Sequence, residues 1–273
     1  MTSLALPEVT LCAVDTRSPA LALRAMRHSM RGLGFARALL LTHGAPPVPA
    51  GIECVEIGVI ESSAAYSDFM LRRLAEHVDT SHVLVIQWDG FVVDPSRWDA
   101  SFLRVDYLGA PWGKAPHGHV VGNGGFSLRS RRLLLALRDP AFAPRLHHPE
   151  DLCIGQTLRP ALESEHGIVF GDLALARRFA FENEPPAEPT FGFHGAVNLP
   201  RMLPASELAA LVDELPPDVA AGRDGFKLSR ALLRAGHVKA ARQLLTRRLA
   251  SGATDWRTRW LAWQARASAA EAR

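Results

Sequence analysis

One feature constrains the fold of this chain more than any other: short apolar runs alternate with segments of helical periodicity. The helical segments, Pro19–Leu33 and Ala64–Val78, repeat apolar residues at intervals of three and four. The apolar, β-favouring runs lie before, between and after them, at Glu8–Thr16, Phe35–Thr42, Ile52–Ile60 and Val83–Val93. Strands that alternate with helices predict βαβ units around a mostly parallel sheet, which is an α/β fold.

The pattern changes near residue 200, after which only Ala- and Leu-rich helical segments follow. Phe226–Ala235 and Val238–Ser251 predict a helix hairpin, and Thr254–Ala270 predicts a third helix that carries three tryptophans. The first and third of these helices begin roughly 30 residues apart, close to the period of tetratricopeptide-type repeats. We therefore predict two domains, an α/β domain over residues 1–199 and a tetratricopeptide-like helical region over residues 200–273.

The composition excludes several classes of protein. With 273 residues, 48% of them hydrophobic, and a net charge of +3, the chain is not extensively disordered. No apolar run is long enough to cross a membrane, and the first residues do not have the pattern of a signal peptide. Three cysteines without a CxxC pair (Cys12, Cys54 and Cys153) indicate free thiols in a reducing compartment, so we expect a cytoplasmic protein.

The basic residues are concentrated in the C-terminal region. Residues 200–273 hold 13 Lys and Arg against 7 Asp and Glu, a net charge of +6, and the remainder of the chain has a net charge of −3. Such a region can attract a polyanion or an anionic membrane surface, but the solubility of an Arg-rich helical module explains it equally well. Because the region lacks surface aromatics interleaved with the charges, we expect no nucleic-acid partner.

Polar residues follow two of the predicted strands. Asp15 comes after the first, and Gln87-Trp88-Asp89 lies in the last. Ligands of open α/β sheets bind at the carboxyl ends of the strands, where Asp89 could bind a divalent ion. Ordinary turn chemistry at an Asp-Gly pair is the alternative. No GxGxxG or GxxxxGK[ST] motif occurs, which argues against a dinucleotide-binding domain or a P-loop NTPase.

The glycine-rich segment Gly122–Arg129 is a second candidate for ligand binding. Its three glycines allow the backbone to approach a ligand closely. We predict that Ser127 and Arg129 begin a helix whose N–H groups favour an anion. A glycine-rich β turn followed by a helix cap is the alternative.

Two further candidates lie later in the chain. Glu150 and Asp151 begin a predicted helix, where one carboxylate can cap the helix and the other can act as a general base. Capping alone is the alternative, and His147 and His148 before them are expected on the surface. His194 lies in the segment FGFHG and is either a metal ligand or a structural histidine. No HExxH or GxSxG motif supports a zinc or serine hydrolase.

The motifs VLVIQWDGFVV, DYLGAPW, GNGGFSLRS, PEDL and FGFHG occur in this order. As a set they resemble a bacterial family of uncharacterised domains classed as glycosyltransferases, with a GT-A-like fold. The resemblance covers about residues 7–199 and leaves the helical tail outside. It implies a Rossmann-like sheet flanked by helices, and a sugar transferred from a nucleotide-sugar donor to a glycan, lipid-linked sugar or other glycoconjugate.

The resemblance also implies roles for the donor-side residues. Asp89 corresponds to the last acid of the DxD motif, which holds manganese or magnesium on the donor diphosphate, and His194 would complete that metal site. Gln87 replaces the first acid of the motif, so the site has one charge fewer. Asp15 would lie near the base or ribose of the nucleotide. The loop beneath the donor sugar would consist of Asn123, Gly124 and Gly125.

On the acceptor side, Glu150 and Asp151 correspond to the acid pair of inverting members. The resemblance implies that Asp151 is the general base and that Glu150 orients the acceptor. The alternative function is a non-catalytic nucleotide-sugar-binding or scaffold protein. In either case the C-terminal helices could bind a protein partner or a second copy of the chain.

Overall fold

The structure is a computed structural model that describes residues 3–113 and 121–271. The chain divides into two compact units, Met1–His194 and Gly195–Arg273. None of the described helices is long and apolar enough to span a membrane.

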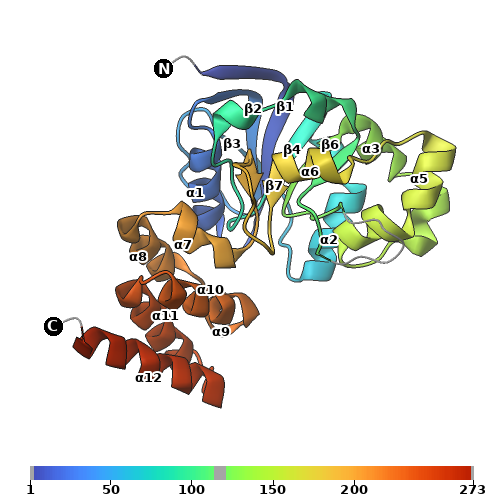
Figure 1. Cartoon of the computed structure of the whole chain (residues 1–273). Coiled ribbons are helices and arrows are strands. Elements are labelled where there is room, and N and C mark those ends of the chain that lie inside the picture. Colours follow the sequence, from blue (N-terminus) through green and yellow to red (C-terminus); the bar gives the residue numbers. More distant parts are fainter. Residues whose placement is uncertain (1–2, 114–120, 272–273) are drawn as a thin grey trace. The chain divides into compact units, whose positions relative to one another are not determined.

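The first unit is built on a six-stranded sheet flanked by helices (Figure 1). Its strands are β1 (Leu4–Val14), β2 (Leu33–Thr42), β3 (Glu53–Glu56), β4 (His82–Ile86), β5 (Tyr107–Gly109) and β6 (Phe126–Ser130). They lie in the order β3-β2-β1-β4-β6-β5. The pairs among β1 to β4 are parallel, and β6 is antiparallel to both β4 and β5. This mostly parallel sheet confirms the predicted α/β class.

The helices of this unit connect and cover the strands. They are α1 (Pro19–Ser29), α2 (Ser63–Arg72), α3 (Arg131–Ala136), α4 (Glu150–Leu152), α5 (Arg159–His166) and α6 (Leu173–Phe179), with short 3₁₀ turns between several of them. Side chains fix where α2 and α3 begin, because the hydroxyls of Ser62 and Ser130 accept hydrogen bonds from the amides of Ala65 and Leu133. Two short strands, β7 (Ala180–Phe181) and β8 (Gly192–Phe193), pair in parallel near the end of the unit.

Three sequence predictions of local structure were wrong in detail. The strand predicted at Val83–Val93 ends at Ile86, because the chain turns and Phe91 packs edge-on against Phe193 instead, with ring centroids 4.7 Å apart. The single helix predicted after Asp151 is divided into α4, a π-helical turn η6 (Cys153–Thr157) and α5, whose second residue is proline.

The third correction concerns Ser127 and Arg129. Both lie in strand β6 and are fully buried, and the helix that follows is α3, capped by Ser130. A predicted anion site at a helix start therefore does not exist at these two residues. The predicted exposure of His147 and His148 is confirmed. Cys12 and Cys153 are buried, Cys54 is half-buried, and all three are free thiols.

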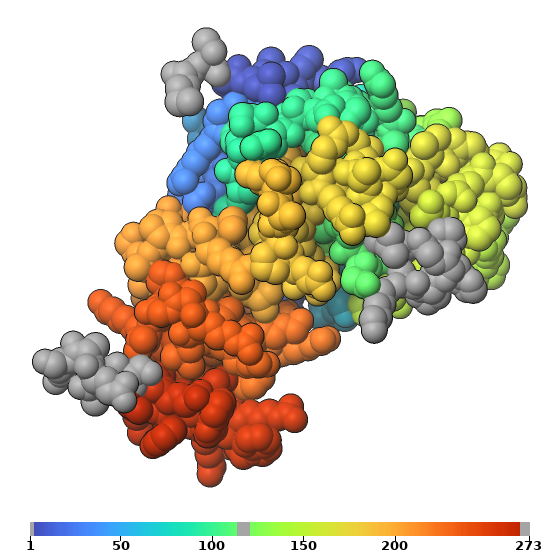
Figure 2. Space-filling model, in the orientation of Figure 1, coloured from blue at the N-terminus to red at the C-terminus, as the bar shows by residue number. Residues whose placement is uncertain are grey.

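The second unit is helical, as predicted. Its helices are α7 (Leu199–Met202), α8 (Ala205–Glu214), α9 (Pro217–Ala221), α10 (Arg223–Arg234), α11 (Val238–Ala250) and α12 (Trp256–Glu271). Leu228, Leu232 and Leu244 form part of its buried interior. Figure 2 shows the surface of α12 in red. Its three tryptophans are exposed, namely Trp256 (72%), Trp260 (51%) and Trp263 (65%), so the premise that this region lacks surface aromatics was wrong.

Candidate functional site

The candidate site lies at the edge of the sheet where β4 ends. Gln87 and Asp89 follow β4 directly. Because β6 runs antiparallel to β4, with Phe126 opposite Ile86, the segment Asn123–Gly125 before β6 reaches the same edge. The sheet topology thus brings together two motifs that are more than thirty residues apart in the sequence.

His194 is in contact with the residues that follow β4. Its Nε2 atom lies 3.3 Å from Asp89 Oδ1 and 3.3 Å from Gln87 Oε1. Its Nδ1 atom lies 3.2 Å from Glu182 Oε1. Burial lowers the pKa of His194, but the carboxylates of Asp89 and Glu182 outweigh this effect and raise the pKa to about 10. The imidazole is therefore protonated at neutral pH and bridges two carboxylates.

The two central glycines are in contact with both halves of the site. A Cβ atom on Gly125 would lie 2.1 Å from Nε2 of His194. A Cβ atom on Gly124 would lie 2.7 Å from Glu150 Oε1 and 3.0 Å from the Cβ atom of Asp151. A side chain at either position would collide with these atoms. Because both residues are glycine, the segment packs between the Asp89–His194 pair and the acid pair at the start of α4.

Glu150 is a buried carboxylate with protein partners on both oxygens. Arg129, whose side chain is fully buried, donates from Nη2 to Glu150 Oε1 at 3.2 Å. The same Nη2 atom donates to the carbonyl of Gly124 at 3.2 Å. Ser67 donates from its hydroxyl to Glu150 Oε2 at 3.4 Å. Both carboxylate oxygens of Glu150 therefore have partners within the protein, and its role in orienting the acceptor stays a prediction.

Asp151 is more accessible than Glu150. It is half-buried and accepts a hydrogen bond from the amide of Leu152 at 2.8 Å. Burial, together with the neighbouring carboxylate of Glu150, raises the pKa of Asp151 above its usual range. A carboxylate whose pKa is raised in this way is a stronger base than an ordinary aspartate.

A pocket of about 300 Å³ opens beside the site, at the carboxyl ends of β1 and β4. Asp15, Tyr66, Gln87 and Trp88 are among the residues that line it. Asp15 also has a structural role, since its Oδ1 atom accepts hydrogen bonds from the amides before α1, including that of Ser18 at 2.7 Å. Asp15, which is predicted to lie near the base or ribose of the nucleotide, therefore lines a pocket and also fixes the start of α1.

The predicted metal ligands only partly fit a metal ion. Asp89 and His194 are adjacent, and Gln87 adds an amide oxygen, which gives one carboxylate where manganese or magnesium sites ordinarily have more acidic oxygen ligands. Within residues 3–113 and 121–271, no group of three or more His, Cys, Asp or Glu side chains could hold a metal ion. The residues present do not by themselves form a metal centre.

The structure thus brings most of the predicted site residues to one edge of the sheet. Their assigned roles remain predictions. Two contributing residues were not anticipated: Glu182, which contacts His194, and Arg129 as the partner of Glu150. The local sequence gives a weak signal for Glu182, an acid that follows the apolar pair Ala180–Phe181.

Comparison with known proteins gives one sequence family and several distant structures. A family model described as "Protein of unknown function (DUF5672)" matches residues 50–194. No curated protein matches the chain in sequence.

Several solved structures align with low identity. A glycosyltransferase involved in the glycosylation of the major capsid of PBCV-1 is 16% identical, with 68% of this chain and 91% of that chain covered and a TM-score of 0.40. The galactosyltransferase LgtC, in complex with donor and acceptor sugar analogs, is 13% identical, with 84% and 95% covered and a TM-score of 0.43. The mannosyltransferase PcManGT from Pyrobaculum calidifontis, in complex with GDP-Man and Mn²⁺, is 12% identical, with 96% and 80% covered and a TM-score of 0.37. At these TM-scores only the residues of the site itself can support a function.

Proposed function

We propose that this chain, which belongs to the DUF5672 family, is a glycosyltransferase that moves a sugar from a nucleotide-sugar donor to a hydroxyl group of a glycan or glycoconjugate. One observation carries the proposal. The Asp89–His194 pair packs against Gly125, and the Glu150–Asp151 pair packs against the adjacent Gly124. This arrangement lies at the edge of the sheet where α/β proteins bind ligands, beside a pocket lined by Asp15.

In this proposal the pocket of about 300 Å³ receives the nucleoside part of the donor. Trp88 offers an aromatic surface to the base, and the polar groups of Asp15 and Tyr66 are available to the ribose. The donor sugar would then lie over Asn123–Gly125, where the absence of side chains at two positions allows close approach.

Asp151 is the proposed general base. It would take the proton of the acceptor hydroxyl while the hydroxyl oxygen forms a bond to the anomeric carbon of the sugar. The bond between that carbon and the diphosphate breaks, and the nucleoside diphosphate leaves with the electron pair, so the configuration at the anomeric carbon inverts. Glu150 acts as a positioning residue, because Arg129 holds it at the start of α4.

A thermal-shift screen with sugar nucleotides and nucleoside diphosphates tests the proposal. A ligand present at about 100 times its Kd stabilises the folded protein by roughly 2.7 kcal/mol, which gives a clear shift in Tm. Positive compounds are then assayed for release of the nucleoside diphosphate. No stabilisation by any compound would contradict the proposal. Stabilisation without turnover, over a broad panel of donors and acceptors, would favour the non-catalytic nucleotide-sugar-binding protein instead.

A matched pair of tryptophan variants makes the assay specific for the pocket. Trp88→Ala removes an aromatic wall of the pocket and should weaken the Tm shift caused by the nucleotide. Trp263→Ala removes an exposed tryptophan of α12 and should leave the shift unchanged.

A cytoplasmic location also remains part of the proposal, because the three cysteines are free thiols.

A further inference from the structure

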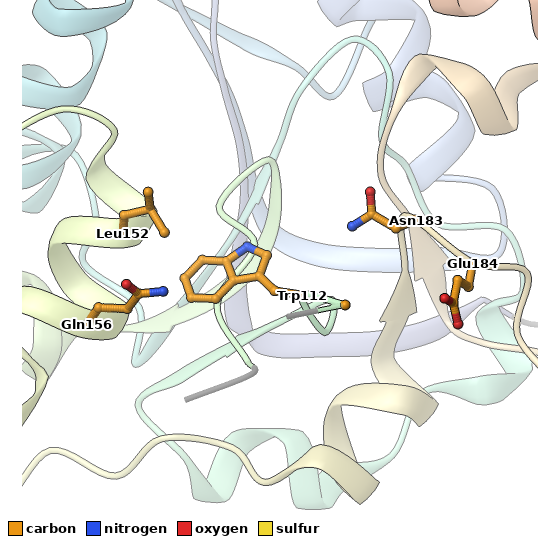
Figure 3. Close-up of a pocket in the computed structure, with 6 residues that line it drawn as sticks. Trp112, Leu152, Gln156, Asn183 and Glu184 are labelled. Carbon is orange, nitrogen blue, oxygen red and sulfur yellow. The ribbon is translucent and has the colours of Figure 1, made fainter. Parts of the chain in front are cut away.

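A second pocket lies next to the acid pair and has no part in the proposed donor site. Its volume is about 470 Å³, and it is lined by Trp112, Gly113, Leu152, Gln156, Asn183 and Glu184. Figure 3 shows the indole of Trp112 between two side chains of the helical segment, Leu152 and Gln156, and two that follow β7, Asn183 and Glu184. Three separate parts of the chain therefore contribute to one pocket.

The position of the indole is fixed by two glycines. A Cβ atom on Gly122 would lie 2.4 Å from the ring of Trp112, and one on Gly155 would lie 3.1 Å from it. The absence of side chains at both positions lets the ring pack directly on the backbone. Trp112 remains half-buried, so a part of its surface is accessible.

Each of the two outer walls is one residue away from the proposed catalytic cluster. Leu152 follows Asp151 and donates its amide hydrogen to Asp151 Oδ1 at 2.8 Å. Asn183 follows Glu182 and donates from Nδ2 to Glu182 Oε2 at 3.1 Å. The other oxygen of Glu182 contacts His194. A molecule in this pocket would therefore lie beside the proposed base.

The side chains of the pocket suit a neutral, hydroxyl-rich ring. The face of an indole is apolar, while the amides of Gln156 and Asn183 and the carboxylate of Glu184 can exchange hydrogen bonds with hydroxyl groups. Among the residues that the structure describes, the six that line the pocket are neutral or acidic, which suits a neutral molecule better than a phosphate. A pyranose has an apolar C–H face and a rim of hydroxyls, which matches this lining.

We infer that the Trp112 pocket is the acceptor subsite, in which the indole stacks on a neutral pyranose of the glycan and presents its hydroxyl to Asp151. This inference rests on the proposed function. The pocket shares Trp112, Gly113, Asn183 and Glu184 with a neighbouring pocket of about 570 Å³. An acceptor of more than one sugar has room to continue into that second pocket.

The test is a carbohydrate titration followed by NMR of the tryptophan indole groups in the full chain. The chain has 6 tryptophans, and the Trp112→Phe variant identifies the indole signal of Trp112. The probes are neutral trisaccharides built from glucose, N-acetylglucosamine, mannose or galactose. We expect at least one of them to shift the Trp112 signal, with about tenfold weaker binding in Trp112→Ala and a smaller loss in Trp112→Phe.

Two additional variants keep the test decisive if Trp112→Ala does not fold. Gln156→Ala removes one polar contact from the pocket and should also weaken binding of the same trisaccharide. Trp263→Ala, at an exposed tryptophan of α12, should bind it as the wild type does. No movement of the Trp112 signal with any probe would overturn the inference, as would equal binding by the wild type and the Trp112 and Gln156 variants.

The failure of this inference and that of the proposed function have different signatures. If nucleoside diphosphates bind but no trisaccharide moves the Trp112 signal, only the acceptor subsite is wrong. If trisaccharides bind at Trp112 but no nucleotide stabilises the protein, the proposed function is wrong, and the pocket is a carbohydrate-binding site without an acceptor role.

Discussion

Arg129 donates to the carboxylate of Glu150 at 3.2 Å in a part of the protein where their side chains are 0% and 8% exposed. Arg129 lies in β6, and Glu150 is the first residue of α4. Because the same guanidinium also binds the carbonyl of Gly124, it connects the glycine-rich segment to the helix that carries Asp151. A buried charge without a partner is costly, so the pair is expected to act as a unit.

Removal of the positive charge alone should therefore be strongly destabilising. We expect Arg129→Met to lower the free energy of unfolding by about 3–5 kcal/mol, since it leaves the Glu150 carboxylate buried without its partner. The double variant Arg129→Met/Glu150→Gln should recover a large part of this loss. Urea denaturation followed by circular dichroism measures both.

An exposed ion pair provides the control. Arg37 binds Glu53 with side chains that are 34% and 52% exposed. Arg37→Met should cost less than about 1 kcal/mol, because solvent screens an exposed pair. Equal losses in the free energy of unfolding from the Arg129 and Arg37 variants would show that burial does not increase the cost of breaking the Arg129–Glu150 pair.

Substitution of Gly125 should displace His194. The Cβ atom of Gly125→Ala would lie 2.1 Å from Nε2 of His194, so the imidazole has to move away from Asp89. We expect a loss of about 1–3 kcal/mol in stability, together with a changed NMR signal of the His194 ring. Gly58→Ala is the control, because a Cβ atom at Gly58 would meet nothing within 4 Å. An unchanged His194 signal in Gly125→Ala would contradict the packing described above.

Replacement of Asp151 separates catalysis from donor binding. As the general base contributes on the order of 10²–10⁴-fold to the rate, Asp151→Asn should lower kcat for transfer by that amount and leave the Kd of the donor nearly unchanged. Single-turnover transfer and a nucleotide titration measure the two quantities. Comparable losses in both would count against Asp151 as the base.

The pH dependence of transfer gives an independent check on Asp151. A general base works in its deprotonated form, so the rate falls as the pH drops below its pKa. Burial and the Glu150 carboxylate raise the pKa of Asp151, so this fall should occur at higher pH than for an ordinary aspartate, whose pKa is about 3.9. In Asp151→Asn the residual rate should no longer fall over this pH range. If the fall persists unchanged, it belongs to the titration of another group.

The sequence was informative wherever local patterns determine structure. Alternating apolar runs predicted the parallel strands and thus the edge of the sheet at which Asp15, Gln87 and Asp89 lie. Periodic apolar residues likewise predicted the helices of the second unit. In both cases the burial of one strand or one helix face leaves a regular trace in the sequence.

Other features depend on contacts between distant segments and leave no such trace. Ser127 and Arg129 are buried polar residues of β6, so this strand has no apolar pattern. Glu182 meets His194 through β7 and β8, which have only two residues each. The place of Trp112 is set by Gly122 and Gly155, whose role is visible only once the ring lies against them.

The neutral side chain of Gln87, which stands in place of an acid, should weaken metal binding at this site. His194 Nε2 lies 3.3 Å from both Asp89 Oδ1 and Gln87 Oε1, so with a carboxylate at position 87 a metal ion that displaces the Nε2 proton would meet two carboxylates and one nitrogen. We expect Gln87→Asp to bind Mn²⁺ measurably in calorimetry without nucleotide, and the wild type to bind it at least tenfold more weakly. Asp89→Asn in the Gln87→Asp background should abolish the gain, because it returns the cluster to one carboxylate. Tight binding of Mn²⁺ by the wild type alone would show that the two existing ligands and the Gln87 amide are sufficient, and that the cluster is a metal centre as it stands.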